Sequence, residues 1–224
     1  MTKIKLTYFD IQGVAEKVRL AFVLNGVDFE DVRIKHAEWQ ELKPKTKFGQ
    51  LPLMQIDDGE EVAQSDAMLR FAATLGAAKL MPKEPIEQLK VNEAMGLVDD
   101  IARSWMPAHS IGMSPQKFGY EEGFQNTDEG KAKVLAMREN WLKTELPKFM
   151  KLVTALIEAN GDEGFLASKD APTIADCHMV PLLRNYQRGF MDGVPTTSLD
   201  EFTTVTAYIK RFLSIPEVAK YYEK

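Results

Sequence analysis

Two short stretches of this chain carry groups suited to holding an acidic peptide. In the stretch 48–56, Pro52 heads an apolar strand, a position where its missing N–H removes no ladder hydrogen bond. The bend there turns the backbone N–H and C=O of Leu51 outward, where an extended peptide can pair with them as an added strand. Ser65, which follows Gln64, offers an N-cap hydroxyl and a helix N-terminus that favours a carboxylate. We therefore predict a small acidic peptide as the ligand.

Three further side chains could serve either a structural role or a functional one. Tyr8 ends a predicted strand, and an isolated aromatic residue there is expected to do no more than cover a sheet face. Trp39 and Lys43 lie one helical turn apart and can share a face. Their spacing alone leaves a surface tryptophan beside a solvated lysine equally open. Their indole N–H and ammonium are also suitable donors to a carboxylate.

Composition and charge exclude several classes of function. The 224 residues include 28 Lys+Arg and 33 Asp+Glu, a formal net charge of −5 without a basic face, so nucleic acid is not an expected partner. The apolar runs are too short to span a membrane, and no secretory segment opens the chain, so we expect a cytoplasmic protein. The single cysteine, Cys177, excludes an intramolecular disulfide and a redox pair. The three scattered histidines lack metal-ligand spacing, so no metal is expected.

The elements that must position these groups begin with a mixed α/β region. Its predicted order is strand 3–9, a helix from Val14 to the Asn25-Gly26 stop, strand 29–34, short helix 37–42, a hairpin turning at 57–59 and helix 66–75. This βαβ, short helix, ββα order predicts a thioredoxin-like α/β domain over residues 1–80. A polar, proline-bearing linker over residues 81–86 follows it.

The remainder, residues 87–224, predicts an all-α domain. An apolar stripe ends at Pro107, and the glycine-rich segment 109–130 is expected to be mostly loop. The later predicted helices are a long one over 131–159 with a bend near Pro147, one opened by a capping box at Thr173–Asp176, and two more over 200–213 and 216–222.

A thioredoxin-like half without a redox cysteine, joined to an all-helical half, resembles a cytosolic glutathione S-transferase of the tyrosine type. The residues that carry the resemblance are Tyr8-Phe9-x-x-x-Gly13-x-Ala15-Glu16-x-x-Arg19, Trp39-x-x-x-Lys43, Phe48-Gly49-Gln50-Leu51-Pro52, Gln64-Ser65, Asp99-Asp100, Thr173-Ile174-Ala175-Asp176 and Ile215-Pro216-Glu217-Val218. The pattern covers nearly the whole chain and is most similar to the sigma class, which includes prostaglandin D synthases and lens S-crystallins. Two features depart from it: Val14 stands where close relatives often carry arginine, and the segment 109–130 is long.

The resemblance implies that the acidic peptide is glutathione, bound as a co-substrate, and that Tyr8 is catalytic. A free thiol has a pKa of about 8.5, and a phenolic O–H that donates to the sulfur favours the thiolate. The residues implied to bind glutathione are Tyr8, Trp39, Lys43, Gln50, Leu51, Pro52, Gln64, Ser65 and, from the partner subunit of a homodimer, Asp100. Trp39 and Lys43 are assigned to its glycine end, and Gln64 and Ser65 to its γ-glutamyl carboxylate.

The implied function is detoxification, by conjugation of the glutathione thiolate to a hydrophobic electrophile. Phe9, Val14 and Trp105 are assigned to the second-substrate pocket, with the segment 109–130 as its lid. One alternative is a glutathione-dependent isomerase of the prostaglandin type, which Val14 disfavours. Another is a non-enzymatic, crystallin-like protein or a carrier of apolar ligands. The intact set of Tyr8, Lys43 and Gln64-Ser65 argues against that loss of activity.

Overall fold

A single four-stranded sheet forms the centre of the N-terminal half. The computed structural model describes residues 2–78, 80–161 and 163–223. The strands are β1 (Ile4–Phe9), β2 (Glu30–Ile34), β3 (Leu53–Ile56) and β4 (Val62–Ala63). Their order in the sheet is β2-β1-β3-β4, with β1 parallel to β2 and antiparallel to β3. Ile4 and Leu6 of β1 are both buried, as the predicted alternation requires.

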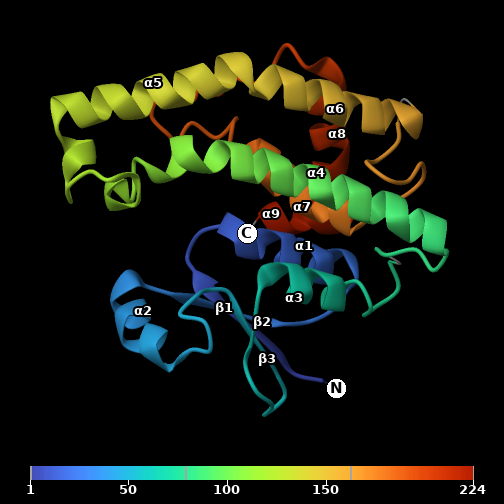
Figure 1. Cartoon of the computed structure of the whole chain (residues 1–224). Helices are drawn as coiled ribbons and strands as arrows, with labels where there is room; N and C mark the ends of the chain where they lie inside the picture. Colours follow the sequence, from blue (N-terminus) through green and yellow to red (C-terminus); the bar gives the residue numbers. More distant parts are fainter. Residues whose placement is uncertain (1, 79, 162, 224) are drawn as a thin grey trace.

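Helices cover this sheet on the side that faces the second half of the chain. The helical segments of the first half are η1 (Gly13–Ala15), α1 (Glu16–Leu24), α2 (His36–Leu42), η2 (Lys43–Lys45) and α3 (Ser65–Ala72). Helices α1 and α3 pack against each other between the sheet and the C-terminal helices (Figure 1). The short helix α2 lies apart from them, beside the sheet (Figure 1). The order of elements is that of the predicted thioredoxin-like domain.

In the second half, the regular structure of the described residues is helical. Its segments are α4 (Pro85–Ser110), η3 (Pro115–Phe118), η4 (Phe124–Asn126), α5 (Asp128–Thr144), α6 (Leu146–Ala159), α7 (Ile174–Arg184), α8 (Thr203–Leu213) and α9 (Pro216–Tyr222). Helices α5 and α6 run end to end on the side away from the sheet (Figure 1). Among the described residues, no helix is both long and apolar enough to cross a bilayer. The expected domain ends at Met1 and Lys224 lie outside the described residues.

The structure corrects two expected helix boundaries, both at prolines. Helix α4 does not end at Pro107 but continues to Ser110, and the N–H of Ile111 donates to the Pro107 carbonyl at 3.2 Å. Proline lacks a donor but keeps its acceptor, so the last turn can still form. The expected helix over 131–159 is two helices, broken at Glu145. Pro147 lies in the first turn of α6, where a backbone N–H has no helical partner anyway.

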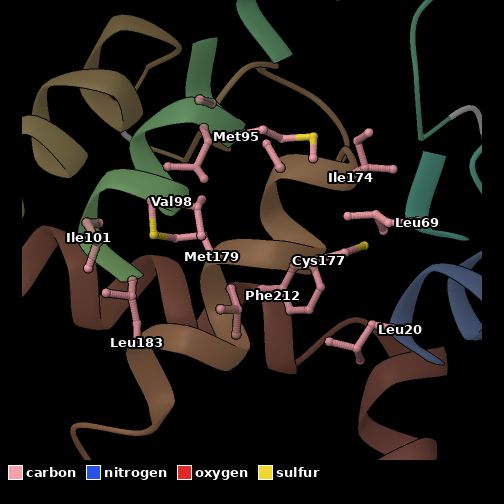
Figure 2. Close-up of a cluster of buried hydrophobic side chains, with 14 of the residues drawn as sticks. Leu20, Leu69, Met95, Val98, Ile101, Ile174, Cys177, Met179, Leu183 and Phe212 are labelled. Carbon is pink, nitrogen blue, oxygen red and sulfur yellow. The ribbon is translucent and has the colours of Figure 1, made fainter. Parts of the chain in front are cut away.

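Helix α7 holds the two halves together through an apolar core. Figure 2 shows its Ile174, Cys177, Met179 and Leu183 surrounded by apolar side chains of the neighbouring helices. Those neighbours are Leu20 of α1, Leu69 of α3, Met95, Val98 and Ile101 of α4, and Phe212 of α8. All of them are nearly or fully buried. Because α7 contacts both α1 and α4, it fixes the first half against the second.

Candidate active site

Sheet topology gathers the predicted peptide-binding groups at one end of the sheet. Thr7 of β1 pairs with Leu53 of β3, and Leu53 pairs in turn with Ala63 of β4. Because both pairings are antiparallel, the end of β1, the start of β3 and the end of β4 meet. Tyr8 therefore lies near the bend that precedes Leu53, and near the start of α3 that follows Ala63.

Tyr8 lies beneath a tight loop that only glycine can complete. Its side chain is buried, 8% exposed, and the Phe9 ring meets it edge-on at 5.7 Å between centroids. Gly13 has a φ of +47°, and a Cβ atom at that position would lie 2.5 Å from the Tyr8 hydroxyl. The loop can therefore pass over the hydroxyl only because Gly13 has no side chain.

Arg19 holds this loop in place, a role that sequence reasoning missed. It is fully buried in α1, and its Nη1 donates to the carbonyls of Ile11 at 2.9 Å and Gln12 at 3.1 Å. The same guanidinium pairs with Glu16 at 3.1 Å and with Asp31 at 3.0 Å. A Glu–Arg pair three residues apart in an apolar helix was the available signal. Arg19 thus positions the loop above Tyr8.

The environment of Tyr8 keeps its hydroxyl protonated. Burial raises the pKa of Tyr8 above its ordinary value, while the Val14 backbone N–H and the Arg19 charge partly oppose the rise. A phenol with a raised pKa carries its proton at neutral pH. The hydroxyl is therefore available as a hydrogen-bond donor rather than as a base.

The predicted bend is present, and it leaves Leu51 outside the sheet. The Leu51–Pro52 peptide bond is cis, and Pro52 is buried. Because β3 begins only at Leu53, the backbone N–H and C=O of Leu51 lie outside its ladder. Gln50, beside it, is exposed. This geometry is suited to pairing with an extended peptide.

Trp39 and Lys43 both approach the site, from different directions. Trp39 is buried at 8% exposure and meets the Phe9 ring edge-on at 6.2 Å, which ties α2 to the end of β1. Lys43 is exposed, and its side chain runs along the hairpin: the Cβ position of Gly49 is 3.7 Å from its Cε. The structure therefore places an ammonium beside the loop that leads to Gln50.

A strained residue leads into the helix that carries Ser65. Gln64 has a φ of +78°, which is unusual for a residue with a side chain, and α3 begins directly after it. Non-glycine residues in this region cost about 1–3 kcal/mol and tend to occur where a site requires them. Gln64 is exposed and Ser65 is half-buried at the helix N-terminus, where anions are favoured.

Behind Ser65 lies a charged cluster that the sequence did not reveal. Lys17 of α1 forms an ion pair with Asp66 of α3, and its Nζ is 3.2 Å from Nε2 of His178. Asp99 of α4 is 4.0 Å from the same nitrogen. Burial, then the Lys17 charge, lowers the pKa of His178 to about 3. His178 is therefore neutral, and the cluster joins α1, α3, α4 and α7.

The remaining predicted residues differ in exposure, and two of them already contact other side chains. Asp100 is exposed on α4 and pairs with Arg103 at 2.8 Å. Trp105 is 5% exposed, its ring packed against Trp141 at 4.9 Å. Val14, by contrast, is 52% exposed beside the Gly13 loop. Within the parts of the chain that the structure describes, no group of three or more His, Cys, Asp or Glu is placed to hold a metal ion.

Family models match both halves of the chain. The model described as glutathione S-transferase, N-terminal domain matches residues 4–74. The model described as glutathione S-transferase, C-terminal domain matches residues 121–224. The two matches together include Tyr8, the hairpin and Ser65 as well as helices α5 to α9.

Individual relatives and a solved structure agree with these matches. Glutathione S-transferase 1 of Ascaris suum is 42% identical over 123 residues, which are 55% of this chain and 56% of that protein. Hematopoietic prostaglandin D synthase of Gallus gallus is 35% identical over 100 residues, 45% of this chain and 49% of that protein. The chain thus spans about half the length of these two curated relatives. A monomeric glutathione S-transferase of the hookworm Necator americanus superimposes with a TM-score of 0.73 at 29% identity, covering 99% of this chain and 96% of that one.

Proposed function

This chain belongs to the glutathione S-transferase family, and from that premise we propose that it conjugates glutathione to electrophilic small molecules. The observation that carries the proposal is the protonated hydroxyl of Tyr8, buried at the sheet end where the peptide-binding bend and the start of α3 also lie. In the reaction the thiol proton passes to solvent, and the thiolate sulfur forms a bond to carbon of the electrophile. In a substitution the leaving group departs with the bonding electron pair, and in an addition the π bond breaks and the neighbouring atom takes up a proton from water.

Tyr8 stabilises the thiolate without taking its proton. The O–H donates to the sulfur, which favours the anion and lowers the pKa of the thiol from about 8.5. Each unit of that lowering corresponds to about 1.4 kcal/mol. The raised pKa of Tyr8 supports this role, because a phenolate would repel the sulfur anion.

The two carboxylates of glutathione are assigned to two different elements. We place the glycine carboxylate between the Trp39 indole and the Lys43 ammonium, and the γ-glutamyl carboxylate at Gln64 and Ser65. Gln50 contributes a side-chain contact, and Leu51, turned outward by Pro52, pairs with the peptide backbone. The positive φ of Gln64 supports this assignment because it presents the α3 N-terminus to the ligand.

For the second substrate we retain Phe9, Val14 and Trp105 as walls of an apolar pocket, with the segment 109–130 as its lid. Val14 supports this assignment because it is exposed and follows Gly13 in the loop over Tyr8. Shortening the segment 109–130 is expected to change the KM of the electrophile more than that of glutathione. The reverse result would exclude a lid.

The decisive experiment is Tyr8→Phe, assayed with 1-chloro-2,4-dinitrobenzene as electrophile. We expect conjugation to fall by about 10²-fold, a typical loss for one preorganised donor to a developing anion. Glutathione affinity, measured by calorimetry, should change little, because the peptide contacts remain. Equal activity in the variant would remove Tyr8 from the mechanism.

A homodimer is the proposed assembly, with Asp100 contacting the γ-glutamyl ammonium bound to the partner subunit. The exposure of Asp100 leaves it free to do so. Asp100→Ala should weaken glutathione binding in a protein that stays dimeric by sedimentation, while Asp200→Ala, an exposed aspartate in another loop, should not. Unchanged affinity in Asp100→Ala, or a monomer like the hookworm relative, would contradict this assignment.

A prostaglandin-type isomerase is the second candidate, favoured by the likeness to the chicken prostaglandin D synthase. In such a reaction the thiolate attacks the substrate and is released again, so glutathione is not consumed. Incubation of the protein with prostaglandin H₂ distinguishes the two activities. Product formation at constant glutathione would indicate isomerisation, and its absence beside active conjugation would exclude it.

The sigma-class, tyrosine-type assignment and a cytoplasmic location are further proposals. The position of Tyr8 near the end of β1 supports the first, and the absence of a spanning helix among the described residues is compatible with the second. We also propose that the domains divide at 1–80 and 87–224 with a linker at 81–86. Limited proteolysis that leaves the linker intact while cutting elsewhere would contradict that division.

A further inference from the structure

Asp66 stands at an unexpected place in the proposed glutathione site. It lies in the first turn of α3, directly after Ser65, which is assigned to the γ-glutamyl carboxylate. Its side chain is 47% exposed, so its carboxylate is partly open to solvent beside that position. A carboxylate in the first turn is favoured by the helix dipole, but it also repels a second carboxylate that binds there. Asp66 alone would therefore weaken the binding of glutathione.

The N-terminus of α3 otherwise suits an anionic ligand. Gln64, its N-cap residue, makes no side-chain hydrogen bond to the first turn. The backbone N–H groups of a first helical turn have no partner within the helix, so an anion can accept from them. The first turn therefore offers donors to a ligand's carboxylate, and the charge of Asp66 opposes that binding.

Lys17 supplies the opposite charge from the interior. It lies on α1, is 5% exposed and forms an ion pair with Asp66. Its Nζ is also 3.2 Å from Nε2 of His178 on α7. Because burial, and then the Lys17 charge, lowers the pKa of His178 to about 3, this imidazole is neutral at pH 7 and adds no charge. The ammonium therefore lies between a carboxylate and a neutral ring nitrogen.

Two other charged groups lie close to this ion pair. Asp99 on α4 is 4.0 Å from the same ring nitrogen. Arg70 lies one turn further along α3, but it donates to Asn92 at 2.5 Å. In the part of the chain that the structure describes, Lys17 is thus the cation within ion-pair distance of Asp66. Removal of Lys17 would leave the charge of Asp66 uncompensated.

We propose that Lys17 is a positioning residue for the γ-glutamyl end of glutathione: it cancels the charge of Asp66 and so leaves the first turn of α3 open to the ligand's carboxylate. This role rests on the proposed function, because it takes glutathione as the ligand. It adds to that function a buried lysine that acts through Asp66 and controls the affinity for one end of the peptide.

Charge cancellation predicts a pattern of signs that a purely structural role does not. By calorimetry at pH 7, Lys17→Met should bind glutathione about fivefold more weakly, because Asp66 is left uncompensated. Asp66→Asn should bind at least as tightly as the unmodified protein, and the double variant Lys17→Met/Asp66→Asn should return to within about twofold of it. If Asp66→Asn binds more weakly, or the double variant stays as weak as Lys17→Met, the pair serves packing alone and the proposal fails.

Two analogues of glutathione locate the effect at one end of the peptide. 4-Aminobutanoyl-cysteinyl-glycine lacks the γ-glutamyl carboxylate, so Lys17→Met should not weaken its binding. γ-Glutamyl-cysteinyl-glycinamide keeps that carboxylate and loses the charge at the glycine end, so the loss seen with glutathione should remain. Equal losses for both analogues would indicate general loosening of the site and would overturn the proposal.

Lys148→Met is the matched control. Lys148 is also ion-paired, with Glu145 at 2.8 Å, but it lies on α6, on the side of the molecule away from the sheet (Figure 1). This variant should bind glutathione as the unmodified protein does. If the unmodified protein binds no glutathione, the proposed function fails together with the role of Lys17. If it binds and conjugates glutathione, but Lys17→Met binds as tightly as Lys148→Met, the role of Lys17 alone fails.

Discussion

Two carboxylates are fully buried, Glu16 in the first half and Asp176 in the second. They differ in how many of their oxygens accept hydrogen bonds. Asp176 accepts four hydrogen bonds: from the Leu166 N–H at 3.0 Å, the Tyr208 hydroxyl at 2.8 Å, and the Thr173 N–H and hydroxyl at 2.7 and 3.0 Å. Both of its oxygens are occupied. This network closes the capping box of α7, which packs between the two halves.

Within the described residues, one oxygen of Glu16 has no hydrogen-bond partner. The Nη2 nitrogen of its partner Arg19 has none either. Through Arg19, the Glu16 network reaches the carbonyls of the loop that covers Tyr8. The saturated carboxylate lies in the packing between the two halves, while the unsaturated one lies beside the loop that covers Tyr8, the proposed catalytic residue. Incomplete pairing is tolerated where a ligand or a positioned loop makes use of it.

Asp176→Ala should produce the largest effect on stability. It leaves the N–H groups of Leu166 and Thr173 and the hydroxyl of Tyr208 buried without an acceptor. We expect the free energy of unfolding to fall by about 3–5 kcal/mol, measured by urea denaturation. Asp176→Asn keeps one acceptor oxygen and should lose less. A loss below about 1 kcal/mol would contradict a structural role for this network.

Much of the Asp176 network could be predicted from the sequence, because it is local. The spacing of Thr173 and Asp176 indicates a capping box, and the structure confirms it. The contact with Tyr208 could not be predicted, since it joins residues 32 positions apart on different helices. The same limit applies to α4. The sequence shows that Pro107 disfavours a continuing helix, but it does not show the tertiary packing around the last turn, which ends at Ser110.

The Glu16 network shows the opposite balance. Motif spacing identified Tyr8, Gly13 and Arg19, but it did not reveal that Arg19 crosses to Asp31 or that a Gly13 Cβ would collide with the Tyr8 hydroxyl. The cluster of Lys17, Asp66 and His178 escaped entirely, because three helices bring it together. The sequence therefore predicts Tyr8 as the reactive group, but it does not reveal the buried charge contacts around it.

Arg19→Lys should lower both the stability of the protein and its rate of conjugation. Lysine keeps the charge but cannot donate at once to two loop carbonyls, Glu16 and Asp31. We expect about 2–3 kcal/mol lower stability and a kcat/KM for conjugation lower by about 10²-fold, because the loop over Tyr8 loses its support. The midpoint of the pH–rate profile should rise, since a displaced Tyr8 stabilises the thiolate less.

Arg138→Lys is the matched control for that variant. Arg138 is also a buried arginine that donates to two backbone carbonyls, Ala108 at 3.2 Å and Asp192 at 2.7 Å, but it lies wholly in the helical half. The Arg138→Lys variant should lose about as much stability as Arg19→Lys, while the midpoint of its pH–rate profile stays unchanged. If both variants move the midpoint equally, the shift reports general loosening and Arg19 has no positioning role.

Gly13→Ala should give the smallest change in stability and the most local change in activity. The positive φ costs an alanine about 1 kcal/mol, and the new methyl group, 2.5 Å from the Tyr8 hydroxyl, must displace the ring or the loop. We expect kcat/KM to fall by about tenfold with glutathione affinity nearly retained. Gly161→Ala has a φ of +91° and no atom within 4 Å of its Cβ, so it should show the strain without the loss of activity. Equal activities in the two variants would mean that Gly13 serves only the turn, and that Tyr8 reacts without help from the loop above it.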